Sequence, residues 1–231
     1  MLNVTEIPNP FPPEPRLKAA LKHTPAYSAL RAYRNWRAVR GWKAAGYPIP
    51  MPKAAQFWIV EQYARRYRYR VFIETGTLKG DMIDAMRRTG IFHWIHSIEL
   101  QPTLARLASQ RFAPYQRPDR HISVHTGNSA DLLPRVLRSY DEPVLFWLDG
   151  HYSGEFTACG EEESPVRQEL HAVLAHAQAK NLKHVILIDN ANFFNGQNGY
   201  ATIPEVEAIV HQYRPTWNVS VEHDVIRITA P

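Results

Sequence analysis

Cysteine is rare in this sequence of 231 residues, and long apolar runs are missing. The one cysteine, Cys159, excludes an intrachain disulfide and a cysteine-rich zinc site, which agrees with a reducing compartment. No run approaches the roughly 18 uncharged apolar residues that span a membrane, and the first residues show no basic segment followed by an apolar one. We therefore expect a cytoplasmic protein.

Acidic residues are scarce in the first part of the chain. Residues 1–70 carry 13 Lys or Arg and 3 Asp or Glu, a net charge of +10, whereas residues 71–231 carry 14 and 19, a net charge of −5. Apolar residues make up 45% of the whole chain, enough to bury a sizeable core. We expect one α/β domain at 51–231, preceded at 1–50 by a proline-rich arm and a basic amphipathic helical extension.

The extension combines aromatic and basic residues at helical spacing. Two rows run side by side within residues 16–43, because a period of three drifts slowly around a helix of 3.6 residues per turn. The apolar row holds Tyr27, Leu30, Tyr33, Trp36, Val39 and Trp42, and the basic row holds Arg31, Arg34, Arg37 and Arg40. Either this helix covers the active site, or it docks on an acidic partner or an anionic membrane surface. Specific binding of nucleic acid is not expected, because the rest of the chain is acidic.

From Tyr69 onward, short β-rich runs alternate with helical stretches, as in a parallel sheet built from βα units. We predict a mostly parallel twisted sheet with helices on both faces and a C-terminal antiparallel hairpin. The expected strands lie near 70–74, 94–98, 121–125, 143–148 and 184–188, with the hairpin strands at 217–221 and 225–229. Helices are expected at about 53–67, 80–88, 102–112, 129–138, 163–179 and 203–213.

A glycine-bearing turn follows the first predicted strand. In open α/β sheets, ligands sit beyond the carboxyl ends of the strands, near the point where the strand order reverses. The residues of the turn are Glu74, Thr75, Gly76, Thr77 and Gly80. Glu99, followed by Leu100, ends the second strand, where a carboxylate can accept hydrogen bonds from both ribose hydroxyls. The Gly-x-x-x-Gly spacing departs from the dinucleotide fingerprint, so we predict an adenosyl ligand other than NAD or FAD.

Polar residues also follow the third, fourth and fifth predicted strands. Asn128 and Ser129 can cap the next helix, and they can also reach an adenine edge. Asp149 follows the fourth strand, and Asp189 and Asn190 follow the fifth. Carboxylate and amide oxygens at neighbouring strand ends suit Mg²⁺ or Ca²⁺. The alternative is that one aspartate caps a helix while the other binds the cofactor's amino group or a loop amide.

Taken together, these segments resemble class I S-adenosylmethionine methyltransferases over about residues 53–231, most closely the cation-dependent O-methyltransferases of the catechol and macrocin types. Residues 72–77, 97–99, 146–154 and 188–190 are similar to a bacterial branch of that family. The resemblance implies a Rossmann-like methyltransferase fold, S-adenosylmethionine as cofactor, and a hydroxylated small molecule or glycan as acceptor. It also implies that residues 74–80 and Asp149 hold the methyl donor, that Glu99 binds its ribose, and that Asn128 and Ser129 lie at its adenine. Asp149, Asp189 and Asn190 would hold the cation.

One position departs from the resemblance. Enzymes of the catechol type have a lysine just after the strand-four aspartate as the base for the acceptor hydroxyl, whereas this chain has His151 nearby. A histidine pKa near ~6.5 suits proton removal at neutral pH, so His151 and Asp149 are the predicted catalytic residues. The alternative is that His151 only hydrogen-bonds a loop or the cofactor. Residues 153–163 are either an active-site lid or a solvated acidic helix start.

Two functions remain open from the sequence. The chain is either an enzyme that methylates an oxygen, or a catalytically idle adenosyl-binding fold that acts through its basic extension. The expected partners are accordingly an acceptor substrate, a membrane surface contacted through residues 16–43, or a second copy of the chain.

Overall fold

The computed structural model describes residues 24–150 and 164–231. The strands are β1 (Val71–Thr75), β2 (Trp94–Glu99), β3 (His121–Thr126), β4 (Val144–Leu148), β5 (Val185–Ile188), β6 (Asn218–Glu222) and β7 (Val225–Thr229). The helices are α2 (Pro25–Ala44), α3 (Lys53–Tyr67), α4 (Asp81–Thr89), α5 (Pro102–Phe112), α6 (Ser129–Leu137), α7 (Val166–Lys180) and α8 (Ile203–Tyr213). Two short 3-10 helices, η1 (Ala113–Tyr115) and η2 (Ala191–Phe193), complete the described elements.

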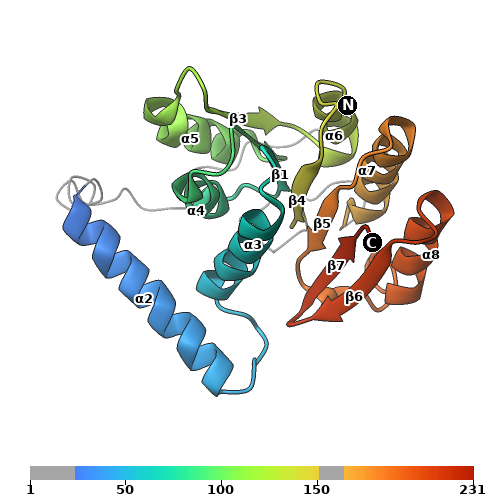
Figure 1. Cartoon of the computed structure of the whole chain (residues 1–231), viewed down its shortest axis with the longest axis horizontal. Coiled ribbons are helices and arrows are strands. Elements are labelled where there is room, and N and C mark those ends of the chain that lie inside the picture. The colour runs from blue at the N-terminus through green and yellow to red at the C-terminus, as the bar shows by residue number, and fades with distance from the viewer. Residues whose placement is uncertain (1–23, 151–163) are drawn as a thin grey trace.

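The strands form one sheet with the order β3-β2-β1-β4-β5-β7-β6 (Figure 1). β1 to β5 pair in parallel, β7 is antiparallel to β5, and β6 is antiparallel to β7. The predicted mostly parallel sheet with a C-terminal antiparallel hairpin is therefore confirmed.

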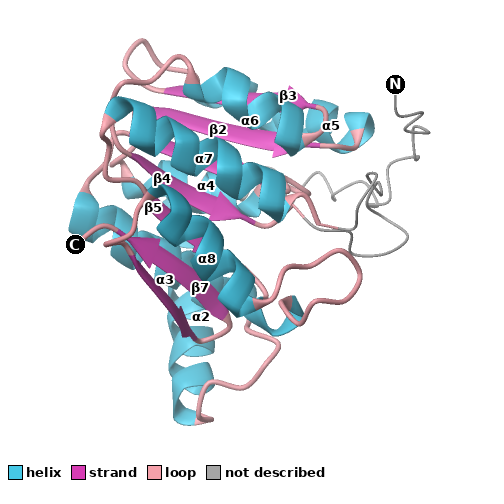
Figure 2. Ribbon diagram, turned by 90° about the vertical axis from the view of Figure 1, so that its right-hand side faces the viewer, coloured by secondary structure: helices cyan, strands magenta, loops and turns pink. Residues whose placement is uncertain are grey.

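Helices cover both faces of the sheet (Figure 2). Side chains alternate between the two faces along each strand. Val71 and Ile73 of β1 accordingly pack into the core beneath α6, α7 and α8, whereas Phe72 packs into the core beneath α3, α4 and α5. β1, β4 and β5 are buried on both faces, and for this reason their sequences are nearly continuous runs of apolar residues.

Most predicted bounds lie within one or two residues of those observed. α7 is the main exception, because it was expected at 163–179 and runs from Val166 to Lys180. Pro165 explains the later start, since a proline disfavours helical geometry in the residue before it, here Ser164. α4 begins at Asp81 because Gly80, at φ +72°, has left-handed backbone geometry.

α2 is one continuous helix, Pro25–Ala44, in the described part of the chain. The side chain of Thr24 accepts a hydrogen bond from the amide of Tyr27 at 3.2 Å and caps the helix start. The helix packs against α3, and it buries Val39 and Trp42. The Trp42 ring also contacts the ring of His223 in the β6–β7 turn, with centroids 5.2 Å apart.

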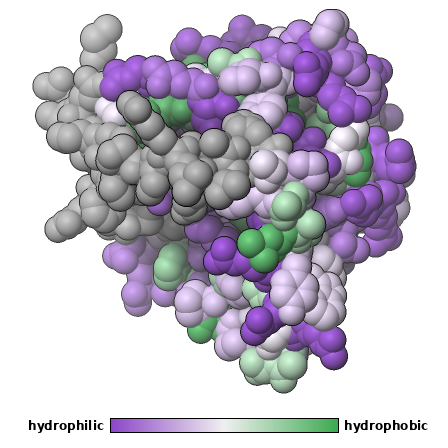
Figure 3. Space-filling view, turned by 90° about the vertical axis from the view of Figure 1, so that its left-hand side faces the viewer, coloured by the Kyte–Doolittle hydropathy of each residue, from purple (hydrophilic) through white to green (hydrophobic). Residues whose placement is uncertain are grey.

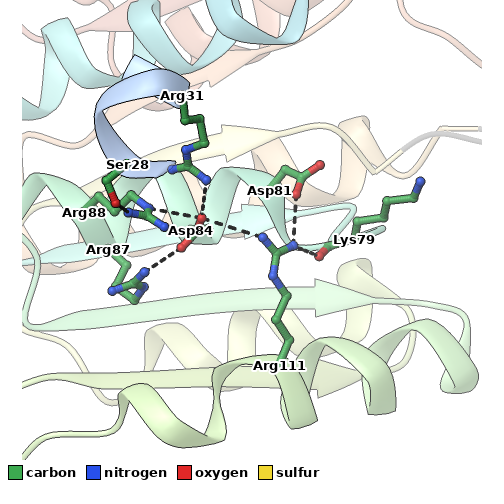
Figure 4. A network of polar contacts seen from close by, with 8 residues as sticks. All are labelled: Ser28, Arg31, Lys79, Asp81, Asp84, Arg87, Arg88 and Arg111. Carbon is green, nitrogen blue, oxygen red and sulfur yellow. Dashed lines mark hydrogen bonds and ion pairs between the residues drawn. The ribbon is translucent and has the colours of Figure 1, made fainter. Parts of the chain in front are cut away.

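A cluster of arginines around Asp84 joins α2 to α4 and α5 (Figure 4). The Asp84 side chain is 6% exposed, and its carboxylate pairs with Arg31 at 2.6 Å, Arg87 at 2.6 Å, Arg88 at 3.2 Å and Arg111 at 3.7 Å. Burial alone would raise the pKa of Asp84, but the guanidinium groups hold that pKa well below its usual range. One buried carboxylate thus connects three helices that are distant in sequence.

We expect Asp84→Asn to lower the free energy of unfolding by about 2 kcal/mol or more, because partly buried arginines would lose their counter-charge. The matched control Asp81→Asn, in the same helix, should cost less than about 1 kcal/mol, since this half-exposed carboxylate pairs with Arg111 alone. Urea unfolding at neutral pH measures both values.

The pH dependence gives a second check on Asp84. Its pKa is depressed in the folded state, so its stabilisation is present above the unfolded pKa of about 3.9 and is lost as the pH falls below it. The difference between native protein and Asp84→Asn should therefore shrink in acid. Equal losses for the two variants at neutral pH would show that Asp84 is not the central counter-charge.

Candidate functional site

The carboxyl ends of β1, β2, β4 and β5 meet at one edge of the sheet. Backbone hydrogen bonds join the residues just beyond the strands, from Gly76 N to Ile98 O at 2.9 Å, from Asp149 N to Thr75 O at 3.2 Å and from Asp189 N to Leu148 O at 3.1 Å. The strand order reverses between β1 and β4, because the chain runs outward to β2 and β3 before it returns to β4. Gly76 and Asp149 thus border the switch point, where open α/β sheets bind ligands, and Glu99 and Asp189 end or follow the strands on either side of it.

The loop after β1 packs directly on the end of β4. Gly76 has φ +83°, and a Cβ added there would overlap the carbonyl oxygen of Asp149 and lie 2.8 Å from its carbonyl carbon. A side chain at Gly76 would therefore push these two segments apart. Gly80 is similarly confined, because a Cβ there would lie 2.5 Å from the ring of Phe112. The predicted tight glycine turn is present.

Glu99 connects the end of β2 to this loop. Its Oε2 accepts a hydrogen bond from the backbone amide of Leu78 at 2.8 Å, and its Oε1 accepts one from the amide of Gln101 at 3.0 Å. Burial raises the pKa of Glu99, and the backbone donors oppose that rise. Leu100, the next residue, is half-buried. Glu99 therefore shapes the predicted ligand loop, and its role toward a ribose stays a prediction.

Glu74 lies beneath the loop. It is 1% exposed, and its Oε1 accepts a hydrogen bond from the Ser97 hydroxyl at 2.6 Å. The Ser97 hydroxyl also contacts the Thr77 hydroxyl at 2.5 Å, so a polar chain links β1, β2 and the loop. Burial raises the pKa of Glu74 well above its usual range, and the charges of Asp149 and Glu99 raise it further. Glu74 thus contributes a buried carboxyl group directly under the predicted cofactor position.

Asn128 caps α6, as one of the two interpretations of the sequence requires. Its Oδ1 accepts a hydrogen bond from the amide of Ala130 at 3.0 Å. Ser129 is buried at the first position of the helix, on the side of the sheet edge where β2 and β3 end. The capping role is confirmed, and contact with an adenine stays a prediction.

Asp149 and Asp189 lie close together at the ends of β4 and β5. Burial raises the pKa of Asp189 to about 8, and the charge of Asp149 contributes to the rise. Gln56, in the first turn of α3, donates a hydrogen bond from Nε2 to Asp189 Oδ2 at 2.6 Å. Asn190 follows with left-handed backbone geometry at φ 57° and is half-buried.

Asp149 and Asp189 are the acidic residues predicted to hold a cation. No group of three His, Cys, Asp or Glu side chains in the described ranges could hold a metal ion. The predicted ligand set contains only two such residues, Asp149 and Asp189, with an amide as the third. The buried Asp189 and the half-buried Asp149 offer carboxylate oxygens, which are hard ligands that suit Mg²⁺ or Ca²⁺. Their chemistry fits such an ion.

Two residues at this edge were missed by the sequence reasoning. No local sequence pattern marks Gln56 as a site residue, because its partner Asp189 is 133 positions away in the chain. Glu169 could have been found from the sequence, because it is an acidic residue at a position of the apolar face of α7, together with Val166, Leu170 and Val173. A Cβ at Gly150 would lie 3.2 Å from Glu169 Oε1, which places this carboxyl group directly under the end of β4.

The charge of Asp149 contributes to the raised pKa values of three neighbouring acids. Burial raises the pKa of Glu169 to about 7, with a further contribution from the charge of Asp149. The same charge contributes to the raised pKa values of Glu74 and Asp189. This part of the sheet edge therefore favours a positively charged ligand and disfavours a phosphate-bearing one.

His151, the predicted base, and residues 153–163, the predicted lid, lie outside the described residues.

No family model and no curated protein matches this chain. Many solved structures share its fold. An O-methyltransferase from Bacillus cereus in complex with S-adenosylhomocysteine has a TM-score of 0.51 and 19% identity, covering 85% of this chain and 90% of that one. The O-methyltransferase TomG from Streptomyces achromogenes, in complex with S-adenosylmethionine, has a TM-score of 0.52 and 17% identity over 86% of this chain and 87% of its own. The methyltransferase PaMTH1 from Podospora anserina, bound to S-adenosylhomocysteine, has a TM-score of 0.50 and 16% identity over 96% and 99%. The predicted Rossmann-like methyltransferase fold is confirmed.

The contact at Gly76 can be tested with a matched pair of glycine variants. Gly76→Ala should lower the free energy of unfolding by more than about 2 kcal/mol, because the new methyl group collides with backbone and strains a left-handed residue. Gly41→Ala, in α2, meets nothing within 4 Å and should stabilise the protein by up to about 1 kcal/mol. Denaturant unfolding measures both. Native-like stability of Gly76→Ala would contradict the close packing of the loop on β4.

Proposed function

We propose that this protein is an S-adenosylmethionine-dependent methyltransferase that methylates a hydroxyl oxygen of a small molecule, a sugar or a glycolipid intermediate. The observation that carries the proposal is the group of acids at this end of the sheet, in which the half-buried Asp149 stands among four buried acids, Glu74, Glu99, Glu169 and Asp189. The negative charge of Asp149 acts on Glu74, Glu169 and Asp189, and such a site favours a cationic adenosyl ligand over a dinucleotide. The fold, shared with methyltransferases bound to S-adenosylmethionine or S-adenosylhomocysteine, supports the same assignment.

The residues of the chain act mainly by binding and positioning. S-adenosylmethionine, when bound, would supply a methyl group on a cationic sulfur for transfer to the acceptor oxygen. The loop at 74–80 and Glu99 would bind the adenosyl part, and Asn128 and Ser129 would bind its base. Asp149, at the end of β4, would orient the donor. His151 takes the proton of the acceptor hydroxyl.

We propose Asp149, Asp189 and the amide of Asn190 as the ligands of a divalent cation. Such an ion, when bound, supplies positive charge that lowers the pKa of the acceptor hydroxyl. Asp189 is held in place for this role by the hydrogen bond from Gln56 to its Oδ2. The repulsion that the charge of Asp149 exerts on the buried Asp189 supports the assignment, because a cation bound to both side chains would relieve it.

The cofactor assignment predicts that Glu99→Gln weakens binding of S-adenosylhomocysteine at least tenfold, or about 1.4 kcal/mol. The amide removes the charge that favours ribose hydroxyls, and it loosens the contact with the Leu78 amide. Calorimetry of the native protein, this variant and the control Glu207→Gln, an exposed position on α8, measures the affinities. Unchanged affinity would show that Glu99 is not the ribose acid. No binding to the native protein at millimolar ligand would end the methyltransferase proposal.

The cation assignment predicts that Asp189→Asn loses binding of Mg²⁺ and Ca²⁺ while it keeps its affinity for S-adenosylhomocysteine. The amide preserves the size of the side chain, so the fold should survive. Asp141→Asn, an exposed carboxylate before β4, is the control and should bind the ions like the native protein. Calorimetry with each ion in the presence of S-adenosylhomocysteine measures this. Ion binding that is the same in both variants would remove the cation from the proposal.

A further inference from the structure

α2 presents one side to the protein and the other to solvent. Val39 and Trp42 are buried, and Arg31 turns inward to Asp84. On the opposite side, Leu30, Tyr33 and Trp36 are each 54% exposed, and Arg34, Arg37 and Arg40 are exposed beside them. At about 100° per residue, Leu30, Tyr33, Arg37 and Arg40 fall within an arc of about 80°. We call the six exposed residues on the solvent side the outer face of α2: Leu30, Tyr33, Arg34, Trp36, Arg37 and Arg40.

The outer face combines aromatic rings with cations. The rings of Tyr33 and Trp36 are stacked with centroids 6.0 Å apart, and the guanidinium of Arg40 lies 5.2 Å from the centroid of Trp36. Hydrophobic and hydrophilic surfaces are mixed on the side of the molecule shown in Figure 3. These contacts hold Arg40 against an aromatic ring and leave its charge directed outward.

Among the residues that the structure describes, no acidic side chain pairs with the three arginines of the outer face. Residues 24–60 contain six Lys or Arg and no Asp or Glu. The structure shows no ion pair between Arg34, Arg37 or Arg40 and another residue of the described ranges, whereas Arg31 on the inner side is paired. Within the described ranges, the outer face therefore presents a positive charge to solvent with no acidic partner.

The helix is held rigidly enough to act as a platform. Its first half is fixed to α4 by the pair between Arg31 and Asp84, and its second half is fixed by the burial of Val39 and Trp42. The 20 residues extend over about 30 Å at 1.5 Å per residue. No described helix is long and apolar enough to cross a membrane, so a contact between α2 and a bilayer would be peripheral.

We propose that the outer face of α2 docks on a bilayer surface that carries anionic headgroups. Tyr and Trp side chains favour the interface of a bilayer, and arginines keep their charge among lipid phosphates while their stems lie on apolar surface. Each basic residue near an anionic bilayer strengthens binding. A second copy of this chain fits poorly, because the same face on both copies would bring arginines against arginines.

The test measures how the full chain partitions onto vesicles by sedimentation. Neutral phosphatidylcholine vesicles are compared with vesicles of which about one-third is phosphatidylglycerol, at low salt and at about 0.5 M salt. We expect at least tenfold stronger binding to the anionic vesicles at low salt, and most of it should be lost at high salt. Equal binding to both kinds of vesicle would overturn the proposal.

Matched variants locate the contact. Arg34→Gln combined with Arg37→Gln and Arg40→Gln should reduce binding to the level of neutral vesicles. The control removes the same charge from exposed arginines elsewhere, at Arg117, Arg135 and Arg138, and should keep native binding. Tyr33→Ser with Trp36→Ser should weaken binding severalfold and leave its salt dependence. Equal losses in the two arginine triples would overturn the proposal.

If the outer face binds something other than a bilayer, the same experiments give different results, and these would overturn the membrane proposal. A dimer that dissociates only in the Arg34, Arg37 and Arg40 triple would assign the face to a second copy. Retention on heparin or on an acidic polypeptide without binding to anionic vesicles would assign it to a soluble polyanion. Native affinity for S-adenosylhomocysteine in the triple variant separates this result from the proposed enzymatic function, because the outer face does not include the cofactor loop.

Discussion

The crowding of buried carboxyl groups at the switch point is the constraint on which the site depends. Glu74 of β1 and Glu169 of α7 are buried, and the half-buried Asp149 at the end of β4 lies near both of them. Burial and repulsion raise the pKa values of Glu74 and Glu169, so the carboxylate forms are destabilised in the fold. A cationic ligand would recover that energy on binding.

Helix α3 connects this site to the rest of the molecule. Its first turn supplies Gln56 to Asp189, its apolar side buries Ile59 and Val60 against the sheet, and its outer side supports α2. α2 in turn is held to α4 through Asp84, which lies four residues after Gly80, the last residue of the loop proposed for the cofactor. The platform proposed for a membrane surface and the loop proposed for the cofactor are therefore parts of one packed layer. Docking through α2 would fix the orientation of the sheet edge relative to the bilayer.

The fold could be predicted closely because its signals are local. α8 was placed at 203–213 and lies there, since Thr202 and Glu205 form a capping box around its start. The strands β1 and β4 stood out as short apolar runs, because a central parallel strand is buried on both faces. The predicted start of α7 was three residues too early, because Pro165 disfavours helical geometry in the residue before it. The positions of Gly76, Glu99, Asp149 and Asp189 at strand ends followed from the same local pattern.

The sequence by itself determined the elements, their order and the strand-end residues of the site, because each depends on periodicity, caps and turns within a few residues. Only the tertiary structure decided that Gln56 holds Asp189, that Glu169 lies under Gly150, and that Asp84 collects arginines from α2, α4 and α5. It also decided which side of α2 is buried. These contacts join residues far apart in the chain, and they exist only once the helices have packed on the sheet, where burial sets which charges must pair.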